Sequence, residues 1–516
     1  MTTKIMIAGC GVGAVRVAKS LVESGYAPVG VYTRDDENSP HRKYLVEDVE
    51  VPDYLDVESL VEAAVEIGAE AVHPAYSFLG DDPDFAREVA RRGVIFIGSP
   101  PSIVELASDK TAVKILAEKA AVPTLPWREV SRVEDIYEFA SVHGYPVVVK
   151  AMMGSGGRGC RVAWSESDVE RVFEAVRKEA KSVFRDSRLY VEPYLESAKY
   201  IEVQVLGDGD SVVHLYEREI SAQLKWRKLV KEAPSPTLSQ SEREKLAEYA
   251  LSVARQLRFK GVGSIRFLFD PKKREAYFSE VRASLKPEHT VTEMTTGVDI
   301  VRKQVEIALY GVLDLKQSSV ELHGHSIGVS ISAENPLTGE ASRGVVVKCR
   351  EPSGLGVRAD LGIAENYRVT GKRELLVAEI AVWAPTRLLA ISRLKRALDD
   401  FVVEGVATNT QLLKHLISSE EFTSGAYTLR FLEEKESYFR ELVRESLELQ
   451  SATLVALLEL GVNSVKKLYE KGAERVVSDV RRISGLKRSA WYYYTLLKHE
   501  ISTRVRKSRG SHLKPK

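Results

Sequence analysis

The sequence predicts a multidomain protein of the α/β and α+β classes, with a doubly wound parallel sheet at its N-terminus and an extra helical module at its C-terminus. The chain has 516 residues, well above the roughly 100–200 residues of a single domain. Strand and helix patterns alternate through the first part of the chain, which is typical of a parallel sheet. The final part has a helical pattern and no proline before Pro515.

The N-terminal unit is predicted to span residues 1–120. Its strands are expected at Lys4–Ala8, Ala27–Tyr32, Ala71–His73 and Val94–Ile97, and its helices at Val15–Glu23, Val57–Ile67 and Ile103–Lys119. Each apolar run is followed by residues at helical spacing, which favours parallel strands joined by crossover helices. The last of these helices is long and leads out of the unit.

Two α+β units are predicted next, a small one over residues 121–200 and a large one over residues 201–436. In the small unit we expect strands at Pro146–Lys150 and Leu189–Glu192 and a charged helix at Ser167–Lys181. The large unit is predicted to consist of antiparallel strands around a helix at Glu242–Arg258, with strands at Ile201–Leu206, Ser211–Glu217, Ser264–Phe269 and Ala276–Val281.

A helical extension is predicted over residues 437–516. Two similar units around Gly461 and Gly485 are spaced like two helix–turn–helix pairs, and a basic tail without acidic residues begins at Ser502. Apolar residues recur at helical spacing, which is typical of a core or a partner-docking face. Each unit lacks the second glycine of a DNA-binding hairpin, so nucleic acid is not the partner that this module predicts.

Composition limits the classes of function. The chain has 74 lysine and arginine residues and 73 aspartate and glutamate residues. This balance argues against a protein that binds nucleic acid through its overall charge. With 44% hydrophobic and 28% charged residues, the chain is not disordered or collagen-like. Three distant cysteines without a CxxC pair disfavour zinc knuckles and disulfide frameworks and favour the reducing cytoplasm. No run of 18 apolar residues occurs, so no membrane partner is expected.

A first glycine-rich loop, Gly9–Ala14, follows a predicted strand and opens a predicted helix. It matches the dinucleotide fingerprint, with Ala14 in the third small position and Asp35 or Asp36 near the ribose position. The free backbone N–H groups of a helix N-terminus can hold pyrophosphate. A plain strand-to-helix turn gives the same pattern, so both interpretations stay open.

A second glycine-rich loop covers residues 154–159 and is followed by a strand pattern, so it is not a Walker loop. A surface hairpin would look the same, but a lid over phosphates is favoured by nearby cations, Lys150 and Lys110. Further along the chain lie a hinge strand that offers backbone groups to adenine, at residues 191–195, and then polar residues and late carboxylates: Gln223, Lys228, Glu232, Glu280 and Glu288. Strand, lid, hinge and carboxylates in this order describe an ATP-grasp arrangement.

From residue 4 to about residue 433 the chain resembles the biotin carboxylase subunit of acyl-CoA and pyruvate carboxylases, within the ATP-grasp superfamily. The resemblance rests on many stretches together, among them AVHPAYSFLG, SDKTAVK, GYPVVVKA, IEVQVLGDG, KEAPSP, PEHTVTEMTTGVD, GHSIGVSISAENP and FVVEGVATNTQLL.

In that family ATP and bicarbonate form carboxyphosphate, and the carboxyl group passes to biotin on a carrier protein. The resemblance therefore implies ATP and Mg²⁺ as cofactors, a homodimer, and a carboxyltransferase as the partner subunit, in an acetyl-CoA, propionyl-CoA or pyruvate carboxylase. Biotin would be a substrate on a separate carrier chain, because no Met-Lys-Met segment occurs here. The implied site consists of catalytic Lys228 and Glu288 and of nucleotide-binding Lys110, Lys150, Gly156, Gly157, Glu192, Leu195, Gln223 and Leu268.

The chain departs from the family at several site positions. Of the two metal-binding glutamates, on adjacent strands in the family, only Glu280 is present, and Arg266 holds the second position. The other replacements are Arg282 for an asparagine, Ser284 for the bicarbonate-binding arginine, Lys286 for a glutamine, Ser330 for the arginine that stabilises the biotin enolate, and Tyr200 and Trp226 for histidines.

These replacements predict a changed metal site. Strand alternation puts four residues on one face of the last strand of the large unit, namely Phe278, Glu280, Arg282 and Ser284. With Arg266 facing them, two arginines flank one carboxylate, which disfavours Mg²⁺ and favours either a structural ion pair or a metal-free phosphate contact. Three functions stay open: a biotin carboxylase subunit, a catalytically impaired structural or regulatory relative, and an ATP-grasp ligase with a different substrate.

Overall fold

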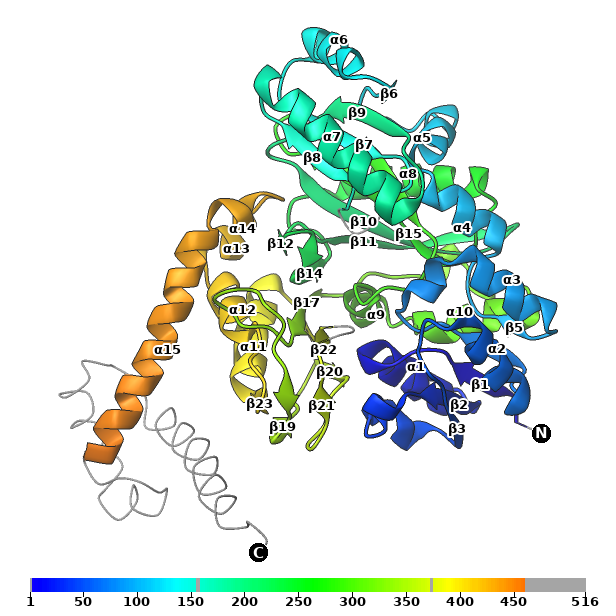
Figure 1. Ribbon diagram of the computed structural model, residues 1–516, viewed down its shortest axis with the longest axis vertical. Helices are drawn as coiled ribbons and strands as arrows, with labels where there is room; N and C mark the ends of the chain where they lie inside the picture. The colour runs from blue at the N-terminus through cyan, green and yellow to red at the C-terminus, as the bar shows by residue number, and fades with distance from the viewer. Residues whose placement is uncertain (1, 155–157, 372–374, 460–516) are drawn as a thin grey trace, which may run out of the picture. The chain divides into compact units, whose positions relative to one another are not determined.

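A computed structural model of the chain describes residues 2–154, 158–371 and 375–459 (Figure 1). The chain divides into two compact units, Met1–Lys435 and Glu436–Lys516. The described part of the second unit is one helix, α15 (Glu436–Glu459). The predicted helix–turn–helix pairs and the basic tail lie outside the described residues. In the ranges that are described, no helix is both long and apolar enough to cross a membrane.

The N-terminal sheet is parallel and doubly wound, as the sequence predicts. Its strand order is β3-β2-β1-β4-β5, and the bounds in chain order are β1 Lys4–Ile7, β2 Ala27–Tyr32, β3 Glu47–Glu50, β4 Ala71–His73 and β5 Ile95–Phe96. Successive residues of β1 point to opposite faces. Ile5 packs against α1 (Gly11–Glu23), whereas Met6 packs against α2 (Val57–Glu66) and α3 (Pro83–Arg91), so helices cover both faces.

The long helix predicted at Ile103–Lys119 is in fact two helices, α4 (Pro101–Ser108) and α5 (Lys110–Lys119). Asp109 between them has an extended backbone, and its carboxylate accepts hydrogen bonds from the backbone N–H groups of the second and third residues of α5. This is an N-cap, which satisfies donors that a new helix leaves free. The apolar spacing continues through the break, so only the capping aspartate marks it in the sequence.

The small unit predicted over residues 121–200, which we call the lid, is a four-stranded antiparallel sheet with one face covered by helices (Figure 1). Its strand order is β6-β9-β7-β8, with β6 Arg128–Val130, β7 Val147–Ala151, β8 Cys160–Ala163 and β9 Leu189–Pro193, and its helices are α6 Val133–His143 and α7 Val169–Glu179. Val147 and Val149 point into the helical layer, so the residue between them and the residue after them point to the other face. The predicted hairpin between β7 and β8 is present, although residues 155–157 lie outside the described chain.

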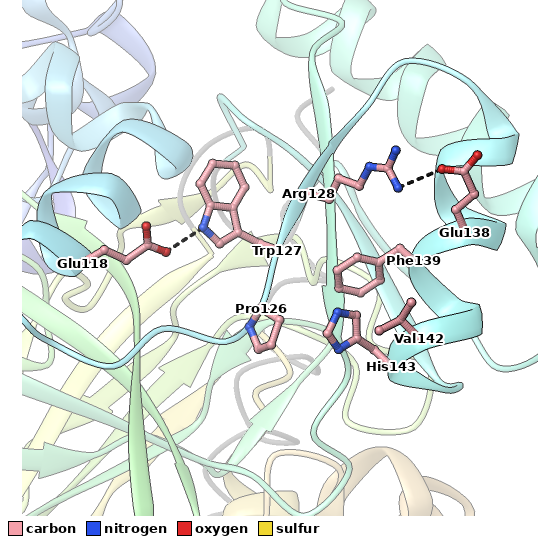
Figure 2. A pocket seen from close by; sticks show the side chains of 8 residues that line it. All are labelled: Glu118, Pro126, Trp127, Arg128, Glu138, Phe139, Val142 and His143. Atoms are coloured by element: carbon pink, nitrogen blue, oxygen red, sulfur yellow. Dashed lines mark hydrogen bonds and ion pairs between the residues drawn. The ribbon is translucent and has the colours of Figure 1, made fainter.

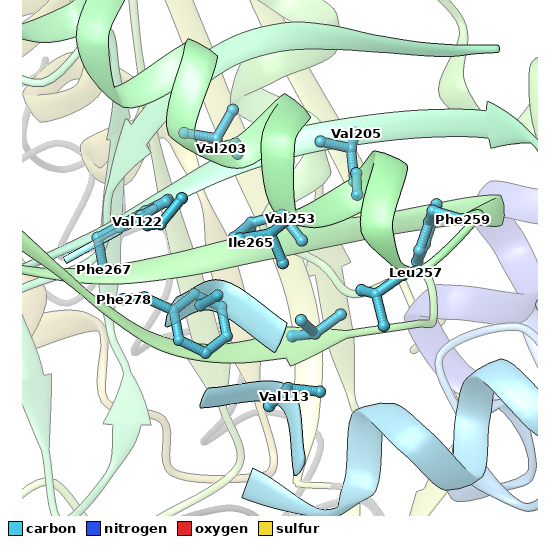
Figure 3. Close-up of a cluster of buried hydrophobic side chains, with 14 of the residues drawn as sticks. Val113, Val122, Val203, Val205, Val253, Leu257, Phe259, Ile265, Phe267 and Phe278 are labelled. Carbon is cyan, nitrogen blue, oxygen red and sulfur yellow. The ribbon is translucent and has the colours of Figure 1, made fainter. Parts of the chain in front are cut away.

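The large unit is built on an eight-stranded antiparallel sheet. Its order is β16-β15-β10-β11-β14-β17-β22-β20, with β10 Lys199–Asp208, β11 Val212–Glu219, β14 Val230–Ala233, β15 Lys260–Asp270, β16 Glu275–Arg282, β17 His325–Ser332, β20 Val357–Leu361 and β22 Leu376–Ala384. Figure 3 shows the core on one face, where Val203, Ile265 and Phe267 meet Val253 of α8 (Gln240–Gln256). Alternation therefore turns the residues between these apolar ones to the opposite face.

A β-bulge corrects one prediction about the last strand. Arg266 lies opposite Glu280, whereas the next residue of β15 lies opposite Phe278, so Ser279 is an extra residue in β16. Such an insertion reverses the facing of the residues on either side of it. Phe278 is in the core while Glu280 and Arg282 line a cleft. The prediction that Phe278 shares a face with Glu280 is therefore wrong.

Short strand pairs and further helices complete the first unit. They are β12 Gln223–Leu224 with β13 Arg227–Lys228, β18 Gly344–Val345 with β21 Arg368–Val369, β19 Lys348–Arg350 with β23 Val402–Glu404, and the helices α9 His289–Thr296, α10 Ile300–Tyr310, α11 Arg387–Asp400, α12 Thr410–Leu416, α13 Glu420–Ser424 and α14 Phe431–Glu434.

Candidate functional site

A cleft of about 280 Å³ lies where the lid, the eight-stranded sheet and a loop of the N-terminal unit meet. It is lined by eight of the residues that the sequence predicts for the site: Lys110, Lys150, Gln223, Lys228, Arg266, Leu268, Glu280 and Glu288. Glu192 stands behind this lining and Leu195 does not line the cleft. Gly156 and Gly157 lie outside the described residues.

Two lysines are fixed at the lid side of the cleft by one buried carboxylate. Lys150 Nζ lies 2.5 Å from Oε1 of Glu192, and Lys114 Nζ lies 2.8 Å from Oε2. Burial alone would raise the pKa of Glu192, but the two lysines lower this pKa to about 2. Sequence reasoning missed Lys114. Lys114 lies one helical turn after Lys110 on the same face of α5, and this spacing could have identified it.

Lys110 differs from these lysines because its ammonium group contacts a backbone carbonyl rather than a carboxylate. Nζ donates a hydrogen bond to the carbonyl of Gly154 in the lid, and within the described ranges no carboxylate lies at ion-pair distance from it. Burial, with the repulsion of Arg282 and Lys150, lowers the pKa of Lys110 to about 8 against the attraction of Glu280. A bound anion here would restore the charged form.

A tight hairpin presents Gln223 and Lys228 side by side. The two residues lie directly opposite each other at the ends of β12 and β13. The turn residues Lys225 and Trp226 have φ values of 50° and 66°, the left-handed pair of a type I′ turn that usually uses Asn and Gly. Side chains larger than Asn or Gly cost backbone strain there, which is typical of functional sites.

A row of alternating charges crosses four neighbouring strands, and two of its members, Arg266 and Glu280, line the cleft. Cross-strand register places Arg218, Glu202, Arg266 and Glu280 side by side on β11, β10, β15 and β16. Successive members are in contact at 2.6 Å, 2.5 Å and 2.7 Å. Directly opposed side chains of opposite charge stabilise an antiparallel sheet. Arg266 therefore faces Glu280 from the neighbouring strand, as the sequence predicts.

Glu202 is the centre of this row and is fully buried. Besides Arg218 and Arg266, Lys228 contacts it, with Nζ 2.8 Å from Oε1. Burial would raise the pKa of Glu202, but its three cations lower it to about 2. Sequence reasoning missed both Glu202 and Arg218. The signal for Glu202 was a carboxylate between the apolar residues of IEVQV, which alternation places on the face away from the core.

The site does not fit Mg²⁺, which needs near-octahedral oxygen ligands. Oε1 of Glu280 accepts hydrogen bonds from Arg266 at 2.7 Å and from Tyr200 at 2.9 Å, and Oε2 lies 3.3 Å from Arg282. A dication about 4 Å from one guanidinium is repelled by about 8 kcal/mol at an effective dielectric of 20, as much as one carboxylate would attract it. In the part of the chain that is described, no group of three His, Cys, Asp or Glu residues could hold a metal ion.

The predicted catalytic pair is in contact. Lys228 Nζ lies 2.8 Å from Oε1 of Glu288. Burial would raise the pKa of Glu288, but Lys228 and Arg266 hold it well below its usual range, whereas burial lowers the pKa of Lys228. A general base works best with a pKa near the working pH, so Glu288 is a weak base in this arrangement. Its Oε2 is buried and has no hydrogen-bond partner in the described chain.

Ser284, at the position of the bicarbonate-binding arginine, and Lys286, at the position of a family glutamine, are tied to the N-terminal unit. The Ser284 hydroxyl donates to Asp81 at 2.5 Å, and Lys286 Nζ lies 2.7 Å from the other oxygen of this carboxylate. Burial would raise the pKa of Asp81, but Lys286 lowers it. A neutral hydroxyl and a paired ammonium thus stand where the family has an arginine and a glutamine.

Ser330, at the position of the biotin arginine, belongs to a buried polar cluster. Its hydroxyl accepts from Lys231 Nζ at 2.8 Å and donates to Glu379 at 3.0 Å, and Lys231 and Glu379 form an ion pair with no exposed side-chain surface. Burial raises the pKa of Glu379 to about 7 despite Lys231. None of the three residues lines the cleft.

The loop Gly9–Ala14 has no room for a dinucleotide. The backbone of Gly362 packs against it, so closely that a Cβ atom at residue 362 would lie 2.6 Å from a backbone nitrogen at the start of α1. Asp36 at the ribose position already accepts hydrogen bonds from the hydroxyls of Tyr54 and Tyr367. The cavity beside the loop measures only about 40 Å³. The structure therefore favours the plain strand-to-helix turn.

A second hollow, of about 600 Å³, lies on the surface between α5, β6 and α6 (Figure 2). Trp127 points toward Glu118 and donates a hydrogen bond to it at 2.9 Å, and Arg128 pairs with Glu138 at 3.0 Å. Its lining shares no residue with the cleft and includes none of the predicted site residues.

Three family models match successive parts of the chain. Residues 1–104 match the biotin carboxylase N-terminal domain, residues 109–316 the ATP-binding domain of the carbamoyl-phosphate synthase L chain, and residues 329–434 the biotin carboxylase C-terminal domain.

Named relatives agree with these matches. A pyruvate carboxylase subunit of Methanothermobacter thermautotrophicus is 34% identical over 87% of this chain and 94% of its own length. The biotin carboxylase domain dimer of Hydrogenobacter thermophilus 2-oxoglutarate carboxylase, solved with MgADP, ADP and bicarbonate, superposes with a TM-score of 0.81 at 36% identity, over 85% of this chain and 99% of that one. A thermophilic 2-oxoglutarate carboxylase domain with ADP, without magnesium and with a disordered phosphate tail, covers the same shares at TM-score 0.73 and 36% identity.

Proposed function

The chain belongs to the biotin carboxylase family, and from this premise we propose that it binds ATP as the biotin carboxylase-type subunit of a biotin-dependent carboxylase. The observation that carries the proposal is the cleft, where Lys110 and Lys150 of the lid side face Gln223, Lys228 and Leu268 of the sheet. Cations and backbone N–H groups suit the phosphates of ATP, and the apolar side chain of Leu268 suits its adenine ring.

The assembly that we propose contains a separate biotin carrier and a carboxyltransferase subunit, and a second copy of this chain. The named relatives are subunits or domains of pyruvate and 2-oxoglutarate carboxylases, and one of them is a dimer. An acetyl-CoA, propionyl-CoA or pyruvate carboxylase is the assembly in which we expect this subunit.

Within that assembly we propose that the chain is impaired in carboxylation. Forming carboxyphosphate from ATP and bicarbonate depends on charge stabilisation around the transferred phosphoryl group and on a base for bicarbonate. Here Arg266 fills a metal-ligand position, Glu288 is a weak base, and Ser284 and Ser330 lack the guanidinium groups of the family. The subunit would then act chiefly through nucleotide binding, as a structural or regulatory member.

A second candidate is full biotin carboxylase activity. It is favoured by the contact between Lys228 and Glu288, because a substrate that displaces Lys228 would free Oε1 of Glu288 to take the bicarbonate proton.

Phosphate release by the full-length chain separates the two candidates. ATP, MgCl₂ and bicarbonate are supplied with and without free biotin, and the variant Lys228→Met reports any contaminating ATPase. The proposal predicts no biotin-stimulated release above that of Lys228→Met. Bicarbonate-dependent release that biotin stimulates and Lys228→Met abolishes would establish the second candidate instead. Failure of the chain to bind ATP would contradict both candidate functions.

A further inference from the structure

Two guanidinium groups are built into the floor of the cleft. Arg266 is held by Nε, 2.5 Å from Glu202, and by Nη1, 2.7 Å from Glu280. Nη2 of Arg282 lies 3.3 Å from both oxygens of Glu280. Only 6% of the Arg266 side chain and 16% of the Arg282 side chain are exposed, and both line the cleft. Their positive charges therefore have fixed places in the fold.

The same charges occupy the place where the family holds a metal ion. The carboxylate that remains at that position, Glu280, already accepts from both arginines and from Tyr200. A divalent cation would have to displace a guanidinium from a cross-strand ion pair, while the second guanidinium stayed close by.

Among the described residues that line the cleft, cations outnumber carboxylates. The carboxylates are Asp81, Glu280 and Glu288, and the cations are Lys110, Lys150, Arg158, Lys228, Arg266, Arg282 and Lys286. The cleft therefore carries a net positive charge, which attracts a negatively charged polyphosphate. A guanidinium can also donate two parallel hydrogen bonds to one phosphate and needs no coordination geometry.

We propose that Arg266 and Arg282 take the place of the divalent cation, so that this cleft binds the phosphates of ADP or ATP without metal. The inference rests on the nucleotide binding proposed above and deepens it. The phosphate tail of ADP is disordered in a relative solved without magnesium; in this chain the two arginines hold the tail.

The test is isothermal titration calorimetry of the full-length chain with ADP, in excess MgCl₂ and in EDTA. We expect dissociation constants that agree within about threefold, since the fixed charges are present in both conditions. Arg282→Met should weaken binding in EDTA by roughly tenfold or more, the usual effect of losing a charged hydrogen bond. Arg255→Met, whose side chain is 58% exposed on α8, is the matched control and should bind as the wild type does.

Two further variants at residue 266 keep the test decisive. Arg266→Met should also lose metal-free binding, and thermal unfolding checks that it is folded. Arg266→Glu restores the family pair of glutamates, so that ADP should bind at least about tenfold more tightly with Mg²⁺ than without it.

Each outcome separates the inference from the proposed function. Tenfold tighter binding of ADP by the wild type with Mg²⁺ would overturn the inference and leave nucleotide binding standing. Metal-independent binding that survives both Arg282→Met and a folded Arg266→Met would overturn the role of the arginines. No binding of ADP or ATP in either condition would overturn the proposed function together with the inference.

Discussion

Replacing Glu202 by glutamine removes the charge at the centre of the row and keeps the size of the side chain. Arg218, Lys228 and Arg266 all lie within 2.5–2.8 Å of this carboxylate, which has no exposed surface. The pKa of Glu202 is about 2 in the folded chain against an ordinary value of 4.5. At 1.36 kcal/mol per pH unit, this difference corresponds to about 3 kcal/mol of stability at pH 7. Breaking a buried ion pair typically costs a similar 3–5 kcal/mol.

The pH dependence of this loss has a definite sign. Because the pKa of Glu202 is lower in the folded chain than in the unfolded one, its stabilisation is fully present above about pH 4.5 and is lost as the pH falls toward 2. The difference in unfolding free energy between the wild type and Glu202→Gln should therefore shrink from about 3 kcal/mol at pH 7 to about 2 kcal/mol at pH 3.5.

Urea unfolding followed by tryptophan fluorescence measures this difference at each pH. Glu248→Gln is the matched control, because that side chain is 70% exposed on α8 and its loss should cost less than about 0.5 kcal/mol. A loss below about 1 kcal/mol for Glu202→Gln at pH 7, or a loss that does not change between pH 7 and pH 3.5, would refute the reasoning.

Three other outcomes are expected. The affinity for ADP should fall as the pH rises from 7 to 9, because the pKa of Lys110 is about 8 in the free chain and bound phosphate raises it; calorimetry at several pH values measures this. Lys114→Met should cost about 3 kcal/mol in thermal or urea unfolding, since Glu192 loses one of two buried partners. Gly362→Ala should cost about 1–3 kcal/mol, because its Cβ atom would press on the backbone nitrogen of Val12, and NAD should not raise the melting temperature of the wild type.

Controls and opposing results follow from the same contacts. Lys110→Met should bind ADP with an affinity that does not change between pH 7 and pH 9, and a wild-type profile equally flat would contradict the assigned titration. Lys119→Met, on the exposed end of α5, should leave stability unchanged. An equal loss for Lys114→Met and Lys119→Met would contradict the role of the ion pair. Stabilisation of the wild type by NAD would revive the dinucleotide interpretation of Gly9–Ala14.

Much of the fold was predictable because its patterns are local. The parallel sheet follows from apolar runs alternating with helical spacing, and Ile5 and Met6 on opposite faces are a direct result of strand alternation. The break at Asp109 and the bulge at Ser279 were not predictable from apolar spacing. A cap changes the backbone without changing that spacing, and a bulge is decided by pairing with a strand that the sequence does not identify.

Site residues that stand in a recognisable motif could be predicted from the sequence. Residues whose role depends on the partner that faces them across neighbouring strands could not. Lys150, Lys228 and Glu288 stand in recognisable stretches and do line one cleft. Glu202 and Arg218 become important only because register brings them beside Arg266 across neighbouring strands. A single sequence gives the direction of a side chain from a strand but not the strand that it faces.

The most direct test of the central claim is a crystal structure of the chain with ADP and MnCl₂, measured at a wavelength where manganese scatters anomalously. We expect ordered phosphates in contact with Arg266 and Arg282, and no anomalous peak within bonding distance of Glu280. A manganese peak bonded to Glu280 and to the phosphates, with Arg266 turned away from the cleft, would contradict the claim that guanidinium groups have replaced the metal.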